Sequence, residues 1–298
     1  MGGTQAMGGR GALLISLTEN LKNQFATDGY FILREFFSAI EIAELRDAAA
    51  DVLSEATRGA RGVGFDPWTK EPGDDINPNR VTYINDIFLM HERFEAHMRT
   101  RKLARVFCDL YGPDINGFQS AAVIKTPQLN NDFHGWHQDA PDYVPLSNYK
   151  NGCAITYLHA MGRDTGGTSL VPGSHRDGVF DRGYEAVEGW PVKKRVIVGF
   201  DTYEARAITP EFMPGDVLVF DSWLMHRANS NYTNESKIGL INVYQARDCI
   251  DLENRNTFGP ANLPITRSRT VLSADESGRM RDEEIAARSS VVEETQIE

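Results

Sequence analysis

Residues 214–231 read PGDVLVFDSWLMHRANSN, and the start of this stretch is a pattern that recurs along the chain after Pro113. A short apolar run, residues 217–220, follows a Pro-Gly-Asp turn and ends at a second polar group. Short runs between Gly, Pro, Asn and Asp are typical of β-strands, and many of them together predict a sandwich or barrel. The other runs that fit this pattern are residues 115–125, 153–158, 168–171, 192–198 and 238–244.

The first third of the chain differs and predicts mainly helices. Apolar residues recur at helical spacing in residues 16–26, and residues 29–37, GYFILREFF, then have the composition of a strand. Ser38 followed three positions later by Glu41 is a capping box, which predicts the start of a second helix. Residues 93–112 return to helical spacing and end in glycine, which predicts one further helix.

We expect a single domain between two peripheral segments. The glycine-rich residues 1–15 predict a flexible N-terminal arm, and residues 16–265 contain the predicted helices and strands. Residues 266–298 are poor in aromatic residues and rich in charge, which predicts a charged C-terminal tail or a peripheral helix. Within the domain, residues 58–82 are rich in Gly, Pro, Asp and Asn and predict a long loop.

The composition excludes several classes of protein. With 31 Lys and Arg against 42 Asp and Glu, the formal net charge is −11, whereas a general nucleic-acid binder needs a basic surface. No stretch approaches the roughly 20 apolar residues of a membrane span. Cys108, Cys153 and Cys249 form no CxxC pair, so neither a disulfide framework nor a thiolate zinc site is indicated. We therefore expect a cytoplasmic protein that binds a small molecule, with neither nucleic acid nor membrane as a partner.

The residues most indicative of chemistry are 136–139, which read Trp-His-Gln-Asp. Residues i and i+2 of a strand point to the same side, so His137 and Asp139 would present an imidazole and a carboxylate together. His226 follows an apolar strand and could project into the same cavity. Two histidines and one carboxylate on one face of a metal form the facial triad of non-haem Fe(II) oxygenases. An HxD triplet alone is a weak signal, because such triplets also occur by chance.

Several longer sequence motifs strengthen this interpretation, because they occur together and in order. Over about residues 18–248 the chain resembles the phytanoyl-CoA dioxygenase family of Fe(II)- and 2-oxoglutarate-dependent oxygenases. The resemblance implies a mainly β fold with flanking helices, a double-stranded β-helix or cupin-like jelly-roll barrel, and His137, Asp139 and His226 as iron ligands. The motifs on which the resemblance rests are GYFILREF at residues 29–36, WHQDAP at 136–141, LVPGSHRDG at 170–178 and PGDVLVFDSWLMHRANSN at 214–231.

The resemblance also implies residues that hold 2-oxoglutarate. Family members usually have an arginine eleven positions after the second histidine, and this chain has Lys237 there. A lysine offers a point charge to the distal carboxylate, whereas an arginine offers a bidentate fork. Gln119 and Lys125 share one face of the preceding predicted strand and match family positions near the cosubstrate, so Lys125 is a second candidate for the carboxylate partner. Thr156, on the predicted strand of residues 153–158, completes the expected set.

The activity implied by the resemblance is oxidation of an unactivated C–H bond, most simply a hydroxylation that uses O2 and converts 2-oxoglutarate into succinate and CO2. Related halogenating enzymes lack the carboxylate ligand, so the presence of Asp139 favours hydroxylation or another oxidation. Residues 58–80 and 176–194 have the character of variable lids, which favours a natural-product intermediate of secondary metabolism as substrate. We expect a monomer or a homodimer.

Three alternatives remain open from the sequence. The chain could be a jelly-roll metal-binding protein without 2-oxoglutarate turnover, a cupin-type metalloenzyme, or an acyl-CoA hydroxylase. A nucleic-acid demethylase is disfavoured by the charge of −11. Other polar groups have simpler interpretations: we expect His175 and Ser174 to hold a turn, and Asp216 and Asp221 to be turn groups near the ligands rather than ligands.

Overall fold

The computed structural model describes residues 16–55, 63–65, 81–127, 135–140, 146–185, 194–250, 252 and 263–283. The predicted arm, residues 1–15, lies outside these residues. So do most of the predicted loop of residues 58–82 and part of each predicted lid.

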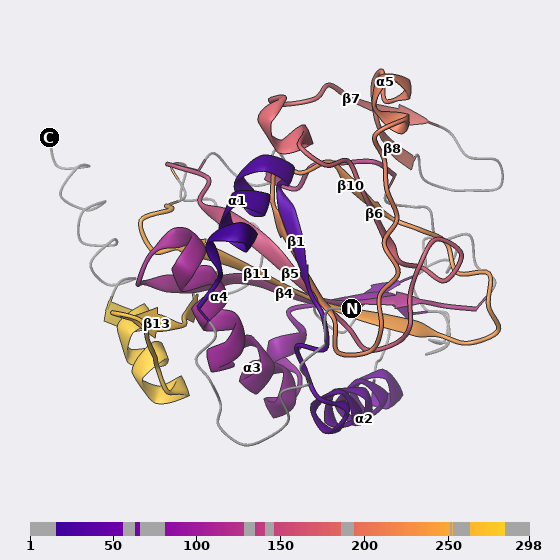
Figure 1. The fold of residues 1–298 in the computed structure, drawn as a ribbon. Helices are drawn as coiled ribbons and strands as arrows, with labels where there is room; N and C mark the ends of the chain where they lie inside the picture. The colour runs from indigo at the N-terminus through magenta and orange to yellow at the C-terminus, as the bar shows by residue number, and fades with distance from the viewer. Residues whose placement is uncertain are drawn as a thin grey trace, which may run out of the picture.

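Among the described residues, eight strands form one antiparallel sheet, which is the body of the protein (Figure 1). From β1 to β4, strands that are neighbours in the sheet are not consecutive in the sequence, as a double-stranded β-helix requires. The β4 strand has the predicted bounds, and β5, β9 and β11 differ from prediction only at their ends. In order across the sheet the strands are β1 (Tyr30–Leu33), β9 (Val217–Asp221), β5 (Asn151–Tyr157), β11 (Lys237–Ala246), β4 (Ile115–Lys125), β3 (Val81–Asn85) and β2 (Val63–Phe65), with β12 (Leu263–Pro264) also paired to β4.

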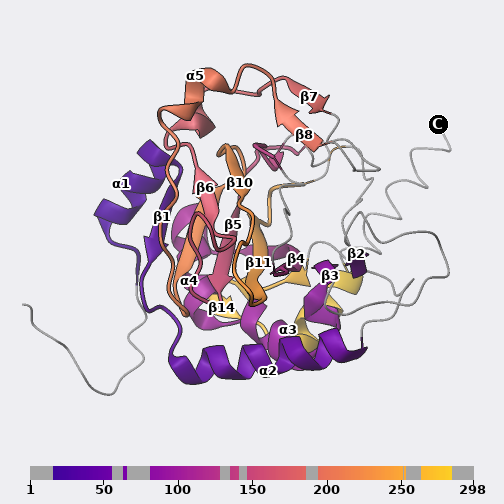
Figure 2. The same ribbon diagram turned by 90° about the vertical axis from the view of Figure 1, so that its right-hand side faces the viewer.

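A second, smaller sheet faces the first. It consists of β6 (Thr168–Leu170) and β10 (His226–Ala228), and single bridges extend it on both sides, from His137 to His226 and from Ile208 to Leu170. The hairpin of β7 (Arg182–Glu185) and β8 (Lys194–Ile197) lies above it, together with the short helix α5 (Asp201–Glu204) (Figure 2). The two sheets confirm the predicted double-stranded β-helix.

Helices pack against the other face of the large sheet (Figure 1). The predicted capping box is present at the start of α2, where the backbone N–H of Ser38 donates to the Glu41 carboxylate at 2.7 Å and the Glu41 N–H donates to the Ser38 hydroxyl at 3.3 Å. The helices on this side are α1 (Glu19–Asp28), α2 (Ala39–Glu55), the 3-10 turn η2 (Ile87–Leu89), α3 (Glu92–Met98) and α4 (Arg101–Tyr111).

The single helix predicted for residues 93–112 is wrong, because the structure divides it into α3 and α4. Thr100 has an extended backbone, with ψ of 135°, and separates the two helices. Met98 and Leu103 are both fully buried in the same core, yet a straight helix would turn them about 140° apart. The break lets both side chains face the sheet.

Successive residues of the central strands serve two different cores. On the helix-covered face, Ala154 and Leu240 join a core with residues from α2, α3 and α4. On the other face, which we call the inner face, Ile155, Leu218 and Phe220 pack in a second core between the two sheets. This alternation follows from the two-residue period of a strand, and it decides which side chains can reach the space between the sheets.

The C-terminal described residues pack onto the body of the protein. The hairpin of β13 (Thr266–Arg267) and β14 (Thr270–Val271) begins at Thr266, which is fully buried and whose hydroxyl accepts the N–H of Ile115 at 2.9 Å. Residues 274–283 are helical, and a second capping box joins Ser273 and Glu276 at the start of this helix. The described part of residues 266–298 is therefore a short hairpin followed by a helix. None of the described helices has the length and apolar character needed to cross a membrane.

A buried hydrogen bond joins α3 to the helix-covered face of the large sheet. His97 Nε2 lies 3.1 Å from the hydroxyl oxygen of Thr156 on β5, and the ring of His97 packs against Phe37 with centroids 4.8 Å apart. Burial lowers the pKa of His97 to about 4; the Glu41 charge opposes this shift and the Lys102 charge adds to it. The imidazole is therefore neutral at pH 7.

We expect His97 to make the fold sensitive to acid. Its folded-state pKa of about 4 lies below the ordinary value of 6.5, so the unfolded chain takes up the proton first and stability falls as the pH drops from about 6.5 towards 4. Urea unfolding of wild type and His97→Gln at pH 7.5 and pH 5 measures this effect. Between pH 7.5 and pH 5, the wild type should lose about 2 kcal/mol more unfolding free energy than His97→Gln. An equal difference at both pH values would contradict the assignment.

Candidate metal centre

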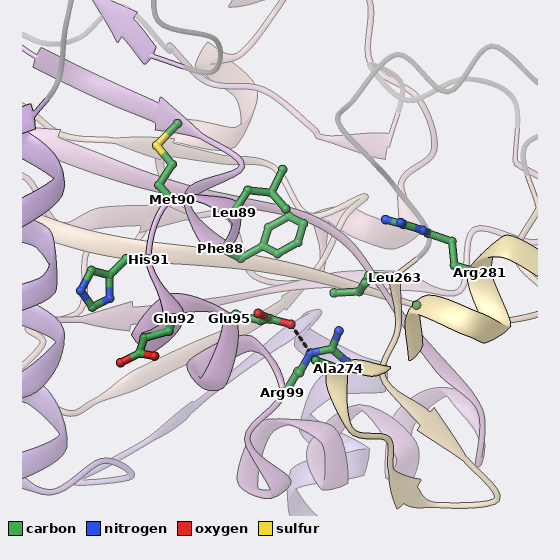
Figure 3. A pocket seen from close by; sticks show the side chains of 11 residues that line it. Phe88, Leu89, Met90, His91, Glu92, Glu95, Arg99, Leu263, Ala274 and Arg281 are labelled. Atoms are coloured by element: carbon green, nitrogen blue, oxygen red, sulfur yellow. Dashed lines mark hydrogen bonds and ion pairs between the residues drawn. The ribbon is translucent and has the colours of Figure 1, made fainter. Parts of the chain in front are cut away.

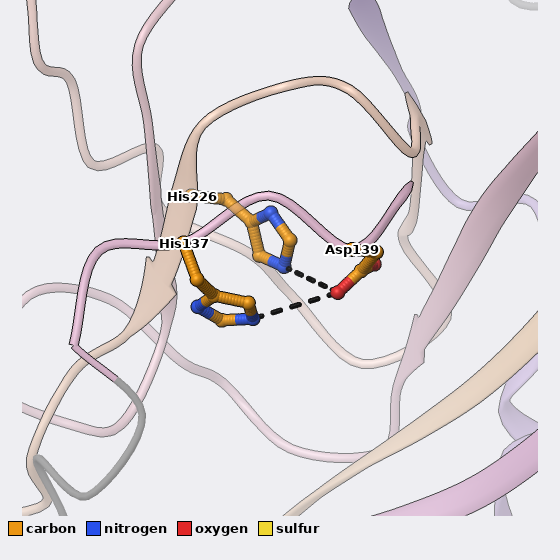
Figure 4. Close-up of side chains that lie close together, drawn as sticks. All are labelled: His137, Asp139 and His226. Carbon is orange, nitrogen blue, oxygen red and sulfur yellow. Dashed lines mark ion pairs between the residues drawn. The ribbon is translucent and has the colours of Figure 1, made fainter. Parts of the chain in front are cut away.

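His137, Asp139 and His226 lie together between the two sheets (Figure 4). Each offers one ligand atom, and the three atoms are all within 4.8 Å of one another. Oδ1 of Asp139 is 3.5 Å from Nε2 of His137 and 3.7 Å from Nε2 of His226. The structure thus brings together the three residues that the sequence predicted as metal ligands.

The backbone sets the spacing of the two histidines. The N–H of His137 donates to the carbonyl of His226 at 2.9 Å, and the N–H of His226 donates back to the carbonyl of His137 at 2.9 Å. The two residues are thus direct cross-strand partners, with ring centroids 4.3 Å apart. Their separation is decided by strand pairing rather than by the torsion angles of long side chains.

Further hydrogen bonds orient each imidazole. Nδ1 of His137 lies 2.8 Å from the carbonyl oxygen of Gly135, and Nδ1 of His226 lies 2.9 Å from that of Leu224. A carbonyl oxygen can only accept, so each Nδ1 carries the hydrogen and each Nε2 keeps its lone pair. Metal-binding histidines are commonly held in this way by a carbonyl on the other ring nitrogen.

The segment between the first histidine and the aspartate is held just as firmly. The N–H groups of Asp139 and Ala140 both donate to the carbonyl of Ser222, at 3.0 and 2.8 Å. Gln138 points away from the ligands, is 4% exposed, and its amide donates to the carbonyls of Gly178 and Trp223 at 2.9 and 2.8 Å. The alternation predicted for this stretch is therefore present, and the outward side chain ties it to its neighbours.

The geometry fits Fe(II). Two imidazole nitrogens and one carboxylate oxygen meet from one side, which is the ligand set of the non-haem iron facial triad and leaves the opposite positions open. The side chains of His137 and Asp139 are 14% and 22% exposed, whereas that of His226 is 9% exposed. Small molecules can therefore approach the carboxylate side of the cluster.

Three of the four residues predicted for 2-oxoglutarate share the inner face of the large sheet. Lys125 on β4 and Lys237 on β11 are directly opposite each other in the strand register, and Gln119 lies on the same face of β4. Lys125 is 3% exposed. The Lys237 side chain is 12% exposed and pairs at 2.9 Å with the carboxylate of Glu235, which is 78% exposed.

This face also contacts the metal ligands. Phe220 on β9 is opposite Cys153 on β5, and its ring lies 4.6 Å from the ring of His226. Burial raises the pKa of the Cys153 thiol, and the charge of Asp139 raises it further. The inner face is therefore in contact with the metal ligands.

Thr156 does not belong to this group, so its expected cosubstrate contact needs correction. It lies between Ile155 and Tyr157, whose side chains are in the core on the inner face. Its own side chain consequently points to the opposite face, where the hydroxyl bonds to His97. The sequence predicted the strand that became β5, but not the face of the sheet on which the Thr156 side chain lies.

Sequence reasoning missed Tyr83 and Asn231. Tyr83 is opposite Val123 on the inner face, and its pKa is raised first by burial and then by the charge of Asp139. Asn231 is fully buried and donates to the carbonyls of Lys125 and Glu235, both at 2.8 Å, so it links the end of β4 to the turn before β11. The strand-like sequence VTYIN at residues 81–85 and the final asparagine of HRANSN were signals that could have identified them.

The polar groups expected to be structural are structural. The Ser174 hydroxyl accepts the N–H of Met225 at 2.8 Å, and His175 Nε2 contacts the carbonyl of Ala26 at 3.3 Å. Asp216 pairs with Arg34 at 2.6 Å before β9 begins. Asp221, at the end of β9, accepts the N–H of Trp223 at 2.8 Å, and burial raises its pKa to about 6.

A separate groove of about 450 Å³ lies between the η2–α3 segment and the C-terminal helix (Figure 3). Phe88, Leu89 and Leu263 give it apolar walls, and Arg99, paired with Glu95 at 2.9 Å, lines it as well. None of the predicted site residues lines this groove, so it is not the metal centre.

Comparisons with known proteins identify the family. The sequence matches the family model of Phytanoyl-CoA dioxygenase (PhyH) over residues 25–239, more than half of the chain. An ectoine dioxygenase of Sphingopyxis alaskensis is 26% identical, with 74% of each chain covered.

Two solved structures are similar in fold. The S. alaskensis protein EctD, crystallised with 2-oxoglutarate and 5-hydroxyectoine, has a TM-score of 0.63 at 24% identity, covering 77% of this chain and 76% of that one. SnoK, a non-haem α-ketoglutarate-dependent carbocyclase from nogalamycin biosynthesis, has a TM-score of 0.58 at 20% identity, covering 81% and 88%. With the family match and the assembled triad, the chain belongs to the phytanoyl-CoA dioxygenase family of Fe(II)- and 2-oxoglutarate-dependent oxygenases.

Proposed function

We propose that this protein hydroxylates an unactivated C–H bond of a small organic molecule and converts 2-oxoglutarate into succinate and CO2. His137, Asp139 and His226 hold Fe(II). The observation that carries the proposal is the cluster itself, in which both Nε2 atoms and one carboxylate oxygen converge while both Nδ1 atoms are engaged by carbonyls. When bound, the iron supplies the binding and activation of O2.

The protein's own residues have two tasks in this reaction. His137, Asp139 and His226 would hold the metal from one direction and would leave it accessible to the cosubstrate and O2. Lys237 and Lys125 attract the distal carboxylate of 2-oxoglutarate to one end of the inner face, and Gln119 contributes hydrogen bonds from the same face. Lys237 is the first candidate for the direct partner, because its present partner, Glu235, is exposed and readily replaced by a better-placed anion.

For the substrate, we propose a natural-product intermediate. One relative is named an ectoine dioxygenase, and the similar structure SnoK is a carbocyclase from nogalamycin biosynthesis, which supports a small-molecule substrate. We further propose that residues 16–265 act as one domain in a cytoplasmic monomer or homodimer. The three cysteines are free and buried, which is compatible with a reducing compartment.

A metal-binding protein without 2-oxoglutarate turnover is the second candidate. It is favoured by one observation, the lysine at position 237 where the family usually has arginine. An acyl-CoA hydroxylase would share the iron chemistry and differ only in substrate.

Anaerobic titration of the Fe(II)-loaded protein with 2-oxoglutarate tests the proposed function. Chelation of iron by the keto acid produces a weak visible charge-transfer band, which we expect to saturate. His226→Ala is the control, and it should lose both iron and band because one of three protein ligands is missing. Bound iron without a band in the wild type would reject the proposal and favour the second candidate.

Lysine variants test the cosubstrate contact. Lys237→Ala should weaken 2-oxoglutarate binding about 10- to 100-fold, since it removes one charge-assisted hydrogen bond, while iron affinity stays the same. Lys237→Arg should keep or improve binding, because arginine offers two donors to the carboxylate. Unchanged affinity in Lys237→Ala, together with a loss in Lys125→Ala, would transfer the role to Lys125.

A further inference from the structure

The turn between β9 and β10, residues 221–225, contacts the segments that carry all three metal ligands. The Ser222 carbonyl accepts the N–H of Asp139 at 3.0 Å. The Leu224 carbonyl lies 2.9 Å from Nδ1 of His226. The Trp223 carbonyl accepts the amide of Gln138, the residue between His137 and Asp139, at 2.8 Å. Three consecutive carbonyls of one turn therefore orient the centre.

Asp221 determines the shape of this turn. Its Oδ1 accepts the N–H of Trp223 at 2.8 Å, two residues further on, which is the hydrogen bond of an Asx turn. Its own carbonyl accepts the N–H of Leu224 at 2.8 Å. The Ser222 hydroxyl, which donates to the carbonyl of Asn151 at 2.8 Å, anchors the turn to β5. The side chain of Asp221 is thus the local contact that holds the Trp223 peptide within the turn.

We propose that Asp221 is a positioning residue for the metal centre, acting through the direction of the Ser222, Trp223 and Leu224 carbonyls. The proposal rests on the proposed function in one respect, that Fe(II) binds at the triad. Without the Asx bond the Trp223 peptide can rotate. The carbonyls that hold the His226 ring and the 137–139 segment then move with it, and the three ligand atoms no longer meet at one point.

The role requires a hydrogen-bond acceptor and not a negative charge. Asparagine has an Oδ1 atom at the same place and can accept the Trp223 N–H, so Asp221→Asn should preserve the turn. Alanine has no acceptor. Serine has one on a shorter side chain. These three variants separate the contact from the charge.

Asp216 provides a matched control at the other end of the same strand. It is 1% exposed, pairs with Arg34 at 2.6 Å, and accepts the N–H groups of Glu35 and Met213, both at 2.9 Å. Removing it disturbs a buried carboxylate next to β9 without touching the β9–β10 turn. Asp216→Ala therefore reports what a general loss of stability does to metal binding.

The experiment measures two quantities in each variant: anaerobic Fe(II) affinity, by competition with a chromogenic chelator, and the urea unfolding of the metal-free protein. Asp221→Ala should weaken Fe(II) binding about 10- to 100-fold, the usual effect of removing a residue that orients ligands. Asp221→Asn should bind like the wild type. Asp216→Ala should lose stability but keep its Fe(II) affinity.

Three results would overturn the positioning role: wild-type affinity in Asp221→Ala, an equal loss in Asp221→Ala and Asp216→Ala, or failure of Asp221→Asn to restore affinity. If Asp221→Ala does not fold, Asp221→Ser gives the comparison, and its Fe(II) affinity should be lower than that of Asp221→Asn because its acceptor is on a shorter side chain. A wild type that binds Fe(II) but shows no 2-oxoglutarate band rejects the proposed function alone, since the affinities still measure the positioning role.

Discussion

The two backbone hydrogen bonds between His137 and His226 are the constraint on which the site depends. They make the histidines cross-strand partners, so the distance between two ligands is a property of β-pairing. Only His137 of residues 137–139 takes part in this pairing, so the bridge cannot hold these three residues in place by itself. The contacts of Gln138 with Gly178 and Trp223, and of Ser222 with Asp139, supply what a longer strand would have supplied.

Much of this arrangement could be predicted because strands have a period of two. The period correctly separated His137 and Asp139 from Gln138, and it put Gln119 and Lys125 on one face of β4. The position of His226 after an apolar strand suggested it as the third ligand, and the family resemblance supported it and supplied Lys237. That Lys125 and Lys237 are exact neighbours across two strands was beyond the sequence, because register depends on the pairing of β4 with β11 and not on either strand alone.

The errors have a common physical origin in complete burial. Every residue of β5 is buried, so hydrophobicity does not distinguish the face towards the helices from the face towards the ligands, and Thr156 was assigned to the wrong one. The same ambiguity concealed the break between α3 and α4, because apolar residues on both sides of Thr100 meet one core. Tyr83 lies on a strand whose existence depends on pairing with β4 rather than on a long apolar run.

The pairing of β1 with β9 has a consequence for how the molecule is made. Tyr30 is opposite Phe220, and His137 is opposite His226. Neither the pairing of β1 nor the metal centre can therefore form until residues beyond position 215 have been synthesised. Contacts between distant parts of a chain form slowly, because the intervening loop must first be closed. Two of the three ligands, His137 and Asp139, are synthesised before the third, so the metal centre is complete only after His226 has been made and has paired with His137.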